Sequence, residues 1–351
     1  MRNFKYKMYV SVLLVCVLCL AACSGASNAQ RYTSTTYCMN TIVDQKAYGA
    51  KAEKAMKAVE EAFFSFEQEL SLYKEDSDIA KINAAAGIQP VQVKAQTVAL
   101  LQDAKEAAIS SENAFALTLA PLSLAWGITS DSPRVLSQQE IDALLPLVDD
   151  TQIRIDVNAS TVYLAKKGQQ IDLGGIAKGT ACNLARDIYE QYGVNSAVLS
   201  IGGNVYVRGA KPDGTLYRIG FRDPKGDASS YIASFTMQDT VFAVSGGYER
   251  YFEQDGVRYH HILDPKTGAP ADSDIVSVGV MKGDGTQADF WSTTLFVWGK
   301  EKTINYMKQG NTIIMLDNQN NLYVSAALQD SFVLLEGMES KYNVIFVEKE
   351  A

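Results

Sequence analysis

The feature that most constrains the fold is the nonapeptide Ile-Asp-Leu-Gly-Gly-Ile-Ala-Lys-Gly at residues 171–179. Its pattern predicts the end of a strand, a tight glycine turn and a helix that runs to about Tyr192, because apolar residues then recur at helical spacing. Adjacent glycines permit an unusual turn and let a ligand approach the main chain. The first N–H groups of a helix lack internal partners and lie at the positive end of its dipole, so phosphate is their natural ligand.

Asp172 and Lys178 flank this turn and add one charge of each sign. The glycine spacing matches neither G-x-G-x-x-G nor G-x-x-x-x-G-K-[ST], so it indicates neither a dinucleotide-binding fold nor a P-loop. Taken alone, the turn is better explained as a plain strand-to-helix connection beside a solvated lysine. A functional interpretation therefore depends on the segments that follow.

Three later segments gather polar residues of the kinds that active sites use. Residues 245–250 read Ser-Gly-Gly-Tyr-Glu-Arg, residues 260–268 read His-His-Ile-Leu-Asp-Pro-Lys-Thr-Gly, and residues 288–295 read Ala-Asp-Phe-Trp-Ser-Thr-Thr-Leu. Together with the glycine turn, and in this order, they resemble the ApbE family of FAD:protein FMN transferases. That family usually reads D-L-G-[GA]-I-A-K-G, S-G-x-Y-E-R, H-I-x-D-P-x-T-G and A-D-x-x-[ST]-T. The resemblance covers nearly the whole mature chain.

The last of these segments predicts a site for a hard cation. Asp289 precedes Ser292 by three residues and Thr293 by four, so on a helix their oxygens share one face. One carboxylate with hydroxyls and main-chain carbonyls suits Mg²⁺ before Ca²⁺. The alternative is a helix start at which Asp289 bonds to backbone amides. The resemblance favours the metal, because it implies that Asp289, Thr293 and the main-chain oxygen of Gly175 bind Mg²⁺.

The chain has two histidines, His260 and His261. A histidine-rich zinc site is therefore excluded, and the lack of G-x-S-x-G argues against a serine nucleophile elbow. Neighbouring side chains on a strand point to opposite faces, so at most one histidine faces a given pocket. By its position in the resemblance this is His261, a candidate catalytic base beside Asp172 and Asp289. A structural histidine that holds the following turn is the competing interpretation.

The resemblance also implies which residues bind FAD. Tyr73 matches a family tyrosine that lies against the flavin, and Met39 matches a methionine near the nucleotide. The chain departs from the family where G-x-F-D-[IV]-T becomes Asn-Ala-Phe-Ala-Leu-Thr, with Ala116 in place of the aspartate. The expected FAD-binding residues are Met39, Tyr73, Ala114, Phe115, Ala116, Asp172, Lys178 and Ile262.

The N-terminus predicts an exported lipoprotein. A region with three basic residues precedes an apolar run too short to span a bilayer, and this run ends in Leu-Ala-Ala before Cys23. We expect a signal peptide over 1–22, a lipidated Cys23, a flexible tether over 23–30 and a domain over 31–351, anchored outside the cytoplasm to a bacterial membrane. An ordinary secretory signal with an incidental cysteine is the alternative.

Loss of the signal peptide changes the formal net charge from −8 to −11. Such an acidic chain is a poor candidate for nucleic-acid binding, which favours basic surfaces. Besides Cys23, the mature chain keeps Cys38 and Cys182. Two cysteines do not make a disulfide framework, so we expect two buried thiols.

The hydrophobic patterns predict an α+β fold with mostly antiparallel β-sheets and packed helices, in a single compact domain. The resemblance implies that this is an ApbE-like domain. Among its elements we expect a strand over 31–43, an amphipathic helix over 46–70 and a strand over 113–118.

The activity implied by the resemblance is Mg²⁺-dependent FAD:protein FMN transfer. The enzyme would cleave FAD, attach FMN through a phosphoester to a threonine or serine of an acceptor protein, and release AMP. The expected acceptor is a membrane redox subunit with a D-x-[ST]-G-A-[ST]-like segment. Alternatives are an FAD pyrophosphatase that uses water at the same site, and a flavin-binding lipoprotein without catalysis.

Overall fold

The computed structural model describes residues 30–227 and 229–350. The predicted signal peptide, the predicted lipidation residue Cys23 and most of the predicted tether lie outside these residues. Within the described part, no helix combines the length and the apolar composition that crossing a bilayer requires.

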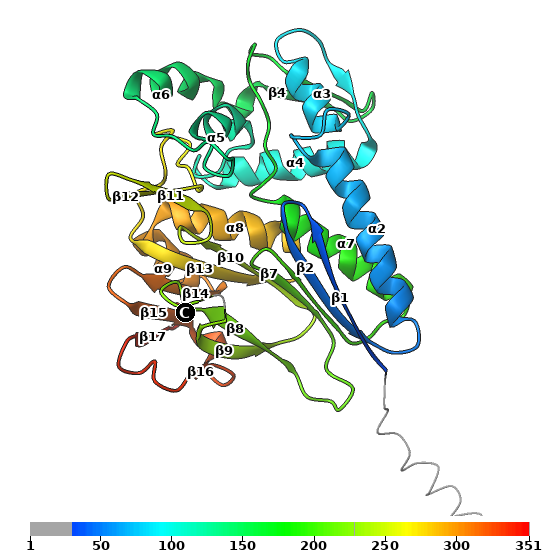
Figure 1. The fold of residues 1–351 in the computed structure, drawn as a ribbon, viewed down its shortest axis with the longest axis vertical. Helices are drawn as coiled ribbons and strands as arrows, with labels where there is room; N and C mark the ends of the chain where they lie inside the picture. The colour runs from blue at the N-terminus through cyan, green and yellow to red at the C-terminus, as the bar shows by residue number, and fades with distance from the viewer. Residues whose placement is uncertain (1–29, 228, 351) are drawn as a thin grey trace, which may run out of the picture.

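The central sheet has nine strands (Figure 1). In order across the sheet they are β1 (Arg31–Cys38), β2 (Thr41–Tyr48), β6 (Ala197–Ile201), β7 (Asn204–Arg208), β10 (Thr240–Gly246), β13 (Ile275–Lys282), β14 (Thr312–Asp317), β15 (Asn321–Ser325) and β17 (Asn343–Val347). Each neighbouring pair is antiparallel except β15 and β17, which are parallel. The predicted α+β class with mostly antiparallel pairing is confirmed.

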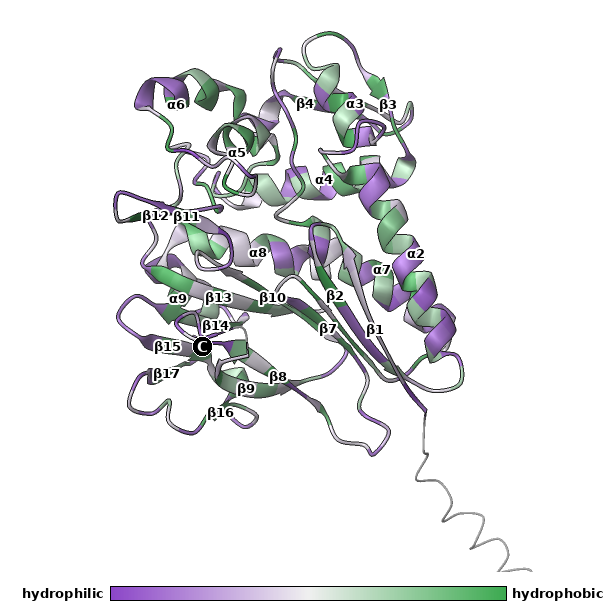
Figure 2. Cartoon of the chain, viewed as in Figure 1, coloured by the Kyte–Doolittle hydropathy of each residue, from purple (hydrophilic) through white to green (hydrophobic). Residues whose placement is uncertain are grey.

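One face of this sheet is covered by α2 (Ala52–Leu70), α7 (Ala177–Gln191) and α8 (Gly285–Trp298) (Figure 1). Apolar and polar bands alternate along α2 (Figure 2), and its Met56 and Val59 belong to one buried cluster with Val43 and Leu199 of the sheet. The amphipathic character predicted for this helix is therefore confirmed.

A helical lobe lies on the far side of α7 and α8 from the sheet (Figure 1). It comprises α3 (Asp78–Ala84), α4 (Ala95–Ser110), α5 (Ala120–Trp126), α6 (Gln138–Leu144) and a small sheet of β3 (Val91–Gln92), β5 (Thr161–Leu164) and β4 (Ile153–Asp156). Apolar side chains of α3, α4 and the small sheet share a buried cluster with Ile176, at the start of α7, and Phe290 of α8, whereas those of α5 and α6 form a separate cluster. The lobe and the sheet thus enclose the two helices that carry the polar motifs.

The opposite face of the central sheet carries β8 (Tyr217–Arg222), β9 (Tyr231–Met237) and β16 (Val333–Leu334). Phe235 of β9 packs edge-on against Phe242 of β10, with ring centroids 4.9 Å apart. The remaining elements are the hairpin β11 (Tyr251–Gln254) and β12 (Val257–His260), α9 (Lys300–Lys308), and short 3₁₀ helices at 117–119, 145–147, 150–152 and 326–328.

The single strand predicted over residues 31–43 is wrong, because the chain reverses at Met39 and Asn40 to form the hairpin β1–β2. Both residues have positive φ, 53° and 55°, as the tight turn of a hairpin requires. No glycine marks this turn, so its sequence carries little signal. Residues 46–48 consequently belong to β2, and the predicted helix begins only at Ala52.

The strand predicted over residues 113–118 is also wrong. Asn113 turns the chain with a φ of 62°, and a 3₁₀ helix follows at 117–119. The Asp150 carboxylate accepts two main-chain N–H groups of this helix, at 2.8 and 2.9 Å. A side chain therefore satisfies the amides that a neighbouring strand would otherwise pair.

Cys38 and Cys182 are buried and free, as predicted. Burial raises the pKa of the Cys38 thiol to about 12. The thiol therefore stays protonated at neutral pH and packs as a small apolar group.

Candidate active site

The glycine turn lies between the helical lobe and the start of α7. The strand end predicted before it is wrong, because residues 171–173 join no sheet. Instead, the Ile171 N–H donates to Asn83 Oδ1 at 2.7 Å, and the Asp172 N–H donates to the carbonyl of Leu117 at 2.9 Å. The predicted helix is confirmed as α7.

Fewer amides are free at the start of α7 than its pattern predicts. The carbonyl of Leu173 accepts the N–H groups of Ile176 (3.0 Å) and Ala177 (2.9 Å). The positive character of this helix end therefore comes chiefly from the dipole and from the neighbouring lysine.

Asp172 and Phe115 hold the turn in shape. Asp172 Oδ1 accepts the Gly174 N–H at 2.9 Å, and burial raises the pKa of this carboxyl. A methyl group at Gly175 would lie 2.7 Å from Phe115 Cε2. The Phe115 ring also packs edge-on against Phe290, with centroids 5.1 Å apart. A residue larger than glycine at position 175 would displace this ring.

Asp289 reaches from α8 to the start of α7. Its Oδ2 accepts the Gly179 N–H at 2.9 Å, and the residue is only 2% exposed. The backbone-amide contact of the alternative interpretation is thus present, but the amide belongs to another helix. Asp289 does not begin its own helix, since Asp284 is the N-cap of α8 and accepts the Gln287 N–H at 2.9 Å.

Two glycines make this contact possible where α7 and α8 cross. A methyl group at Gly179 would overlap the carbonyl oxygen of Gly285 and lie 2.6 Å from Asp289 Cβ. A methyl group at Gly285 would in turn overlap the carbonyl oxygen of Gly179. The helices therefore approach closely enough for a short carboxylate to reach the main chain of its neighbour.

Lys178 lies between the glycine turn and the Asp289 carboxylate. Its Nζ donates to the carbonyl of Gly174 at 3.2 Å and lies 3.6 Å from Asp289 Oδ1. A carbonyl oxygen and a buried carboxylate thus face the same ammonium group. The space between the turn and Asp289 favours positive charge.

The two hydroxyl residues near Asp289 have different surroundings. Ser292 Oγ donates to the main-chain oxygen of Asp289 at 2.8 Å and lies 2.8 Å from Ser245 Oγ. Thr293 lies one helical turn beyond Asp289, and its Oγ1 is 3.4 Å from Ser245 Oγ. Ser245 opens the Ser-Gly-Gly-Tyr-Glu-Arg segment, but its place opposite Thr293 emerges only from the fold.

These oxygens fit a hard divalent cation. Asp289 Oδ1, Thr293 Oγ1 and the carbonyls of the glycine turn are donors of the kind that Mg²⁺ prefers. In the part of the chain that the structure describes, no three His, Cys, Asp or Glu side chains gather as a metal-binding group. A cation here would therefore rely on one carboxylate and neutral oxygens, which leaves coordination positions for phosphate and water.

His261 and His260 occupy different environments. The carbonyl of Arg250 accepts the His261 N–H at 3.0 Å and lies 3.2 Å from its Nδ1. Because a carbonyl can only accept, the neutral ring carries its proton on Nδ1 and keeps a lone pair on Nε2. Burial, together with the charges of Arg250 and Lys178, lowers the pKa of His261 to about 3. His260 Nε2 instead bonds the carbonyl of Ala271 at 3.2 Å, which is a structural role.

Tyr73 and Met39 lie in separate loops. Tyr73 is 66% exposed after the end of α2, and its N–H donates to Ser71 Oγ at 3.2 Å. Met39 forms the β1–β2 turn, whose Asn40 carbonyl accepts from Arg250 Nη2 at 2.8 Å. The turn is therefore tied to the segment that positions His261, whereas Tyr73 presents its ring to solvent.

The other expected FAD-binding residues contribute mainly from the interior. Ala114, Phe115 and Ile262 are buried, so their side chains shape the site without offering it a polar group. Ala116 is partly exposed. Position 116, where the family pattern has an aspartate, is thus partly accessible, but its alanine offers no carboxylate.

Comparisons with known proteins identify the family. The ApbE family model matches residues 39–316. The FAD:protein FMN transferase of Treponema pallidum is 32% identical over 92% of this chain and 95% of its own length, and that of Klebsiella pneumoniae is 35% identical over 80% and 86%. Two solved structures are similar, the ApbE protein of Thermotoga maritima (31% identity, TM-score 0.76, 89% and 99% coverage) and the flavin transferase ApbE of Vibrio cholerae (25%, 0.77, 86% and 99%). The chain belongs to the ApbE family.

Proposed function

We propose that this chain is an FAD:protein FMN transferase that acts with Mg²⁺. The activity named for its relatives supports the reaction class. The observation that carries the proposal is the convergence of Asp289, Lys178 and the glycine turn at the start of α7, with Thr293 one turn from Asp289. The low pKa of His261, caused first by burial, keeps this candidate base neutral. A protein that merely bound flavin would need neither the buried carboxylate nor the base.

The reaction exchanges one phosphorus–oxygen bond for another. The hydroxyl oxygen of a threonine or serine on the acceptor attacks the phosphorus of the FMN half of FAD. As that bond forms, the bond from this phosphorus to the bridging oxygen breaks, and the bridging oxygen leaves with AMP. The hydroxyl proton passes to a base and then to solvent, so no oxidant or reductant is needed.

Asp289, Thr293 and the main-chain oxygen of Gly175 would hold the Mg²⁺. When bound, the ion neutralises charge on the pyrophosphate and on the AMP leaving group. The protein supplies the remaining attraction, because the dipole of α7 and the Lys178 ammonium both favour an anion beside the turn. Asp172 keeps the turn closed through its bond to Gly174.

His261 is the proposed base, with its Nε2 lone pair directed by the Nδ1 contact to Arg250. In the free protein burial, and after it the positive charges of Arg250 and Lys178, lower the pKa of His261 and make it weakly basic. Bound pyrophosphate offsets the Lys178 charge and so raises the pKa of His261 toward its ordinary value of 6.5. The base thus strengthens when the substrate is present. Asp172 is the weaker candidate, since its carboxylate already holds the turn.

The proposed acceptor is the one that the resemblance to the ApbE family implies, and the proposed location rests on the N-terminal sequence pattern. We propose a membrane redox subunit with a D-x-[ST]-G-A-[ST]-like segment as the acceptor. We also propose that Cys23 carries lipid and anchors the domain outside the cytoplasm, supported by the short apolar run and the Leu-Ala-Ala that precede this cysteine.

Incubation of the full chain with FAD, Mg²⁺ and a candidate acceptor protein tests the function. Covalent flavin fluorescence on the acceptor in a denaturing gel, with AMP released in equal amount, is the expected result. AMP and free FMN without labelled protein would identify an FAD pyrophosphatase instead. Flavin binding with no AMP release would leave only a binding protein.

A further inference from the structure

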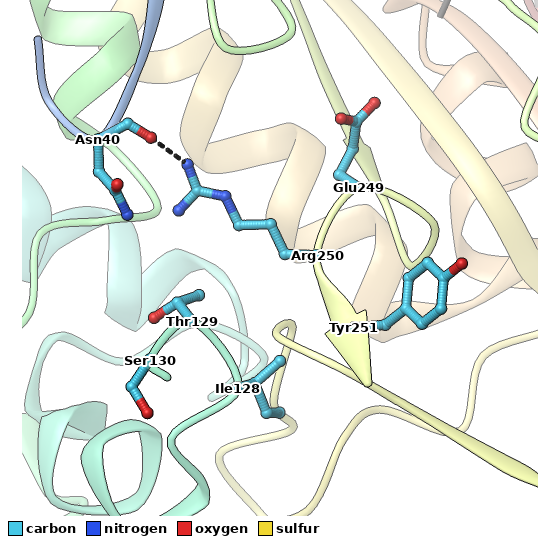
Figure 3. A pocket seen from close by; sticks show the side chains of 7 residues that line it. All are labelled: Asn40, Ile128, Thr129, Ser130, Glu249, Arg250 and Tyr251. Carbon is cyan, nitrogen blue, oxygen red and sulfur yellow. Dashed lines mark hydrogen bonds between the residues drawn. The ribbon is translucent and has the colours of Figure 1, made fainter. Parts of the chain in front are cut away.

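An open cavity of about 350 Å³ lies beside the candidate active site (Figure 3). It is bordered by the β1–β2 turn, the loop after α5 and the segment that leads into β11, and its lining residues are Asn40, Ile128, Thr129, Ser130, Glu249, Arg250 and Tyr251. Its volume suits a few side chains of a bound segment.

Arg250 is the charged group that this cavity offers to a ligand. Its guanidinium extends toward Asn40 (Figure 3), where Nη2 donates to a neutral main-chain carbonyl at 2.8 Å. Glu249 points away from it in the same view and pairs with Arg222 Nη1 at 3.1 Å. Among the ion pairs of residues 30–227 and 229–350, none includes Arg250. A planar guanidinium with unused donors suits a carboxylate, which it can bind with two parallel hydrogen bonds.

One residue, Arg250, both lines the cavity and contacts the proposed base, His261. The Arg250 carbonyl accepts the His261 N–H and lies 3.2 Å from its Nδ1, while the Arg250 side chain lines the cavity. Thr41, next to the hairpin turn, also lies near Lys178, because a methyl group at Gly202 would touch both Thr41 Oγ1 (2.7 Å) and Lys178 Cδ (3.1 Å). A segment seated in the cavity therefore lies close to where a hydroxyl must meet the FMN phosphorus.

The remaining polar groups of the cavity suit a main chain. Tyr37 donates its hydroxyl to Asn40 Oδ1 at 2.6 Å, which fixes the Asn40 amide and directs its NH₂ group elsewhere. That NH₂ group and the Thr129 hydroxyl can bond the carbonyls of an extended peptide.

We propose that this cavity receives the acceptor polypeptide, and that Arg250 binds an acidic side chain a few residues from the hydroxyl that takes FMN. The inference rests on the proposed function and names the partner's chemistry at the same site. Charge complementarity selects the occupant. The anionic groups of FAD are already matched by Lys178, the α7 dipole and the Mg²⁺ proposed at Asp289. The Arg250 guanidinium is therefore left to bind a second anion. The whole chain has a formal net charge of −8, which repels an acidic segment, so Arg250 is the local point of attraction.

The test uses the full chain loaded with FAD and Mg²⁺, and three short dye-labelled peptides. One contains D-I-S-G-A-T, and the others carry asparagine or lysine in place of the aspartate. Fluorescence anisotropy gives each Kd, and flavin fluorescence on the peptide gives the KM for transfer. The wild-type protein is expected to bind the acidic peptide about tenfold or more tightly than the asparagine peptide, as a charge-assisted pair predicts.

Variants of Arg250 show whether the preference for the acidic peptide depends on this side chain. Arg250→Gln should abolish the preference for the acidic peptide, Arg250→Lys should retain part of it, and Arg250→Glu should favour the lysine peptide. The Kd for FAD, followed by quenching of flavin fluorescence, should stay the same in Arg250→Lys, which keeps the charge near His261, and should change less than the Kd for the acidic peptide in the other two. The matched control is Arg218→Gln, which removes an exposed arginine of β8 that bonds Ser234 and Ser331 and should change neither constant.

Two results of the binding measurements would overturn the proposal: equal binding of all three peptides by the wild-type protein, or a loss of FAD affinity in Arg250→Gln as large as the loss of peptide affinity. Equal FMN labelling of the three peptides would refute the role of Arg250 while the proposed function stands. Release of AMP and FMN with no labelled peptide or protein would refute the proposed function, and anisotropy would still decide whether the cavity selects the acidic peptide.

Discussion

Asp289 on α8 accepts a hydrogen bond of 2.9 Å from the main-chain N–H of Gly179 on α7, across 110 residues of sequence. This contact fixes one carboxylate oxygen, while the other lies 3.6 Å from Lys178 Nζ. A carboxylate that is 2% exposed requires compensation by nearby donors or cations. The helix crossing thus delivers one buried negative charge to the glycine turn, where phosphate and cation chemistry is proposed.

The crossing itself predicts the effect of Gly179→Ala. Helix propensity alone would favour alanine by about 1 kcal/mol. The added methyl would overlap the Gly285 carbonyl, however, so we expect a net loss of about 1–3 kcal/mol in the free energy of unfolding, as for an overpacked core. Urea denaturation measures this difference. Gly283→Ala is the control, because its methyl would meet nothing within 4 Å. Equal stability of the two variants would show that the helices can move apart without cost.

Asp289→Asn tests the charge at this site. Asparagine keeps the size and an acceptor oxygen for Gly179, but it removes the formal charge, so Mg²⁺ affinity should fall about tenfold or more. Thr293→Val removes a neutral oxygen of similar shape and should weaken Mg²⁺ less. Isothermal titration with Mg²⁺ and the Mg²⁺-dependent rise in Tm report binding without the reaction.

Mass action gives the second readout of the same variant. Raising Mg²⁺ should restore part of the transfer activity of Asp289→Asn, since occupancy follows concentration. Full transfer by this variant at submillimolar Mg²⁺ would move the cation site away from Asp289. A variant that is unfolded at every Mg²⁺ concentration would assign Asp289 to the helix crossing alone.

Local patterns in the sequence predicted α7 and the amphipathic α2, because both depend on residues a few positions apart. The strand expected before the glycine turn failed for the opposite reason. The Ile171 N–H bonds an asparagine 88 residues away, a partner that no neighbouring pattern reveals. The hairpin turn at Met39 and Asn40 was missed because neither residue is glycine, although both have positive φ.

The residues of the candidate site also differ in whether the sequence could predict them. Asp289, Thr293, Lys178 and His261 could be selected by resemblance, since each belongs to a recognisable segment. The contacts of Gly179, Gly285 and Ser245 could not be predicted, although Gly179 and Ser245 lie in recognisable segments too, because each acts through a partner on another element. A glycine that permits two helices to touch looks in sequence like any other glycine.

Tyr73→Ala tests the flavin contact expected from the resemblance. The ring is 66% exposed and free to stack on a planar ligand. An aromatic pair contributes about 0.5–1.5 kcal/mol beyond its buried area, so the Kd for FAD should rise by a factor of about ten at most. Tyr73→Phe keeps the ring and should bind FAD like the wild type. Quenching of flavin fluorescence gives both constants, and an unchanged Kd in Tyr73→Ala would remove this residue from the site.

His261 predicts how stability depends on pH. Its pKa lies near 3 in the folded protein and near 6.5 when unfolded. Between these values the unfolded chain binds a proton that the folded protein does not, so stability falls as the pH drops from 6.5 towards 3, with a slope of up to about 1.4 kcal/mol per pH unit. Above pH 6.5 the contribution is complete and the slope vanishes. His261→Gln lacks this titration, so its unfolding free energy should fall less steeply over the same window.

Urea unfolding of both proteins at a series of pH values isolates the His261 contribution, because the other titrating groups are common to the pair. FAD supplies the matching test of the base. Bound pyrophosphate raises the pKa of His261, so wild-type protein should take up protons on binding FAD near pH 6, and His261→Gln should take up fewer. Titration calorimetry in buffers of different ionisation enthalpy measures this uptake. Equal uptake by the two proteins would show that His261 does not sense the phosphate, and the base would then have to be sought at Asp172.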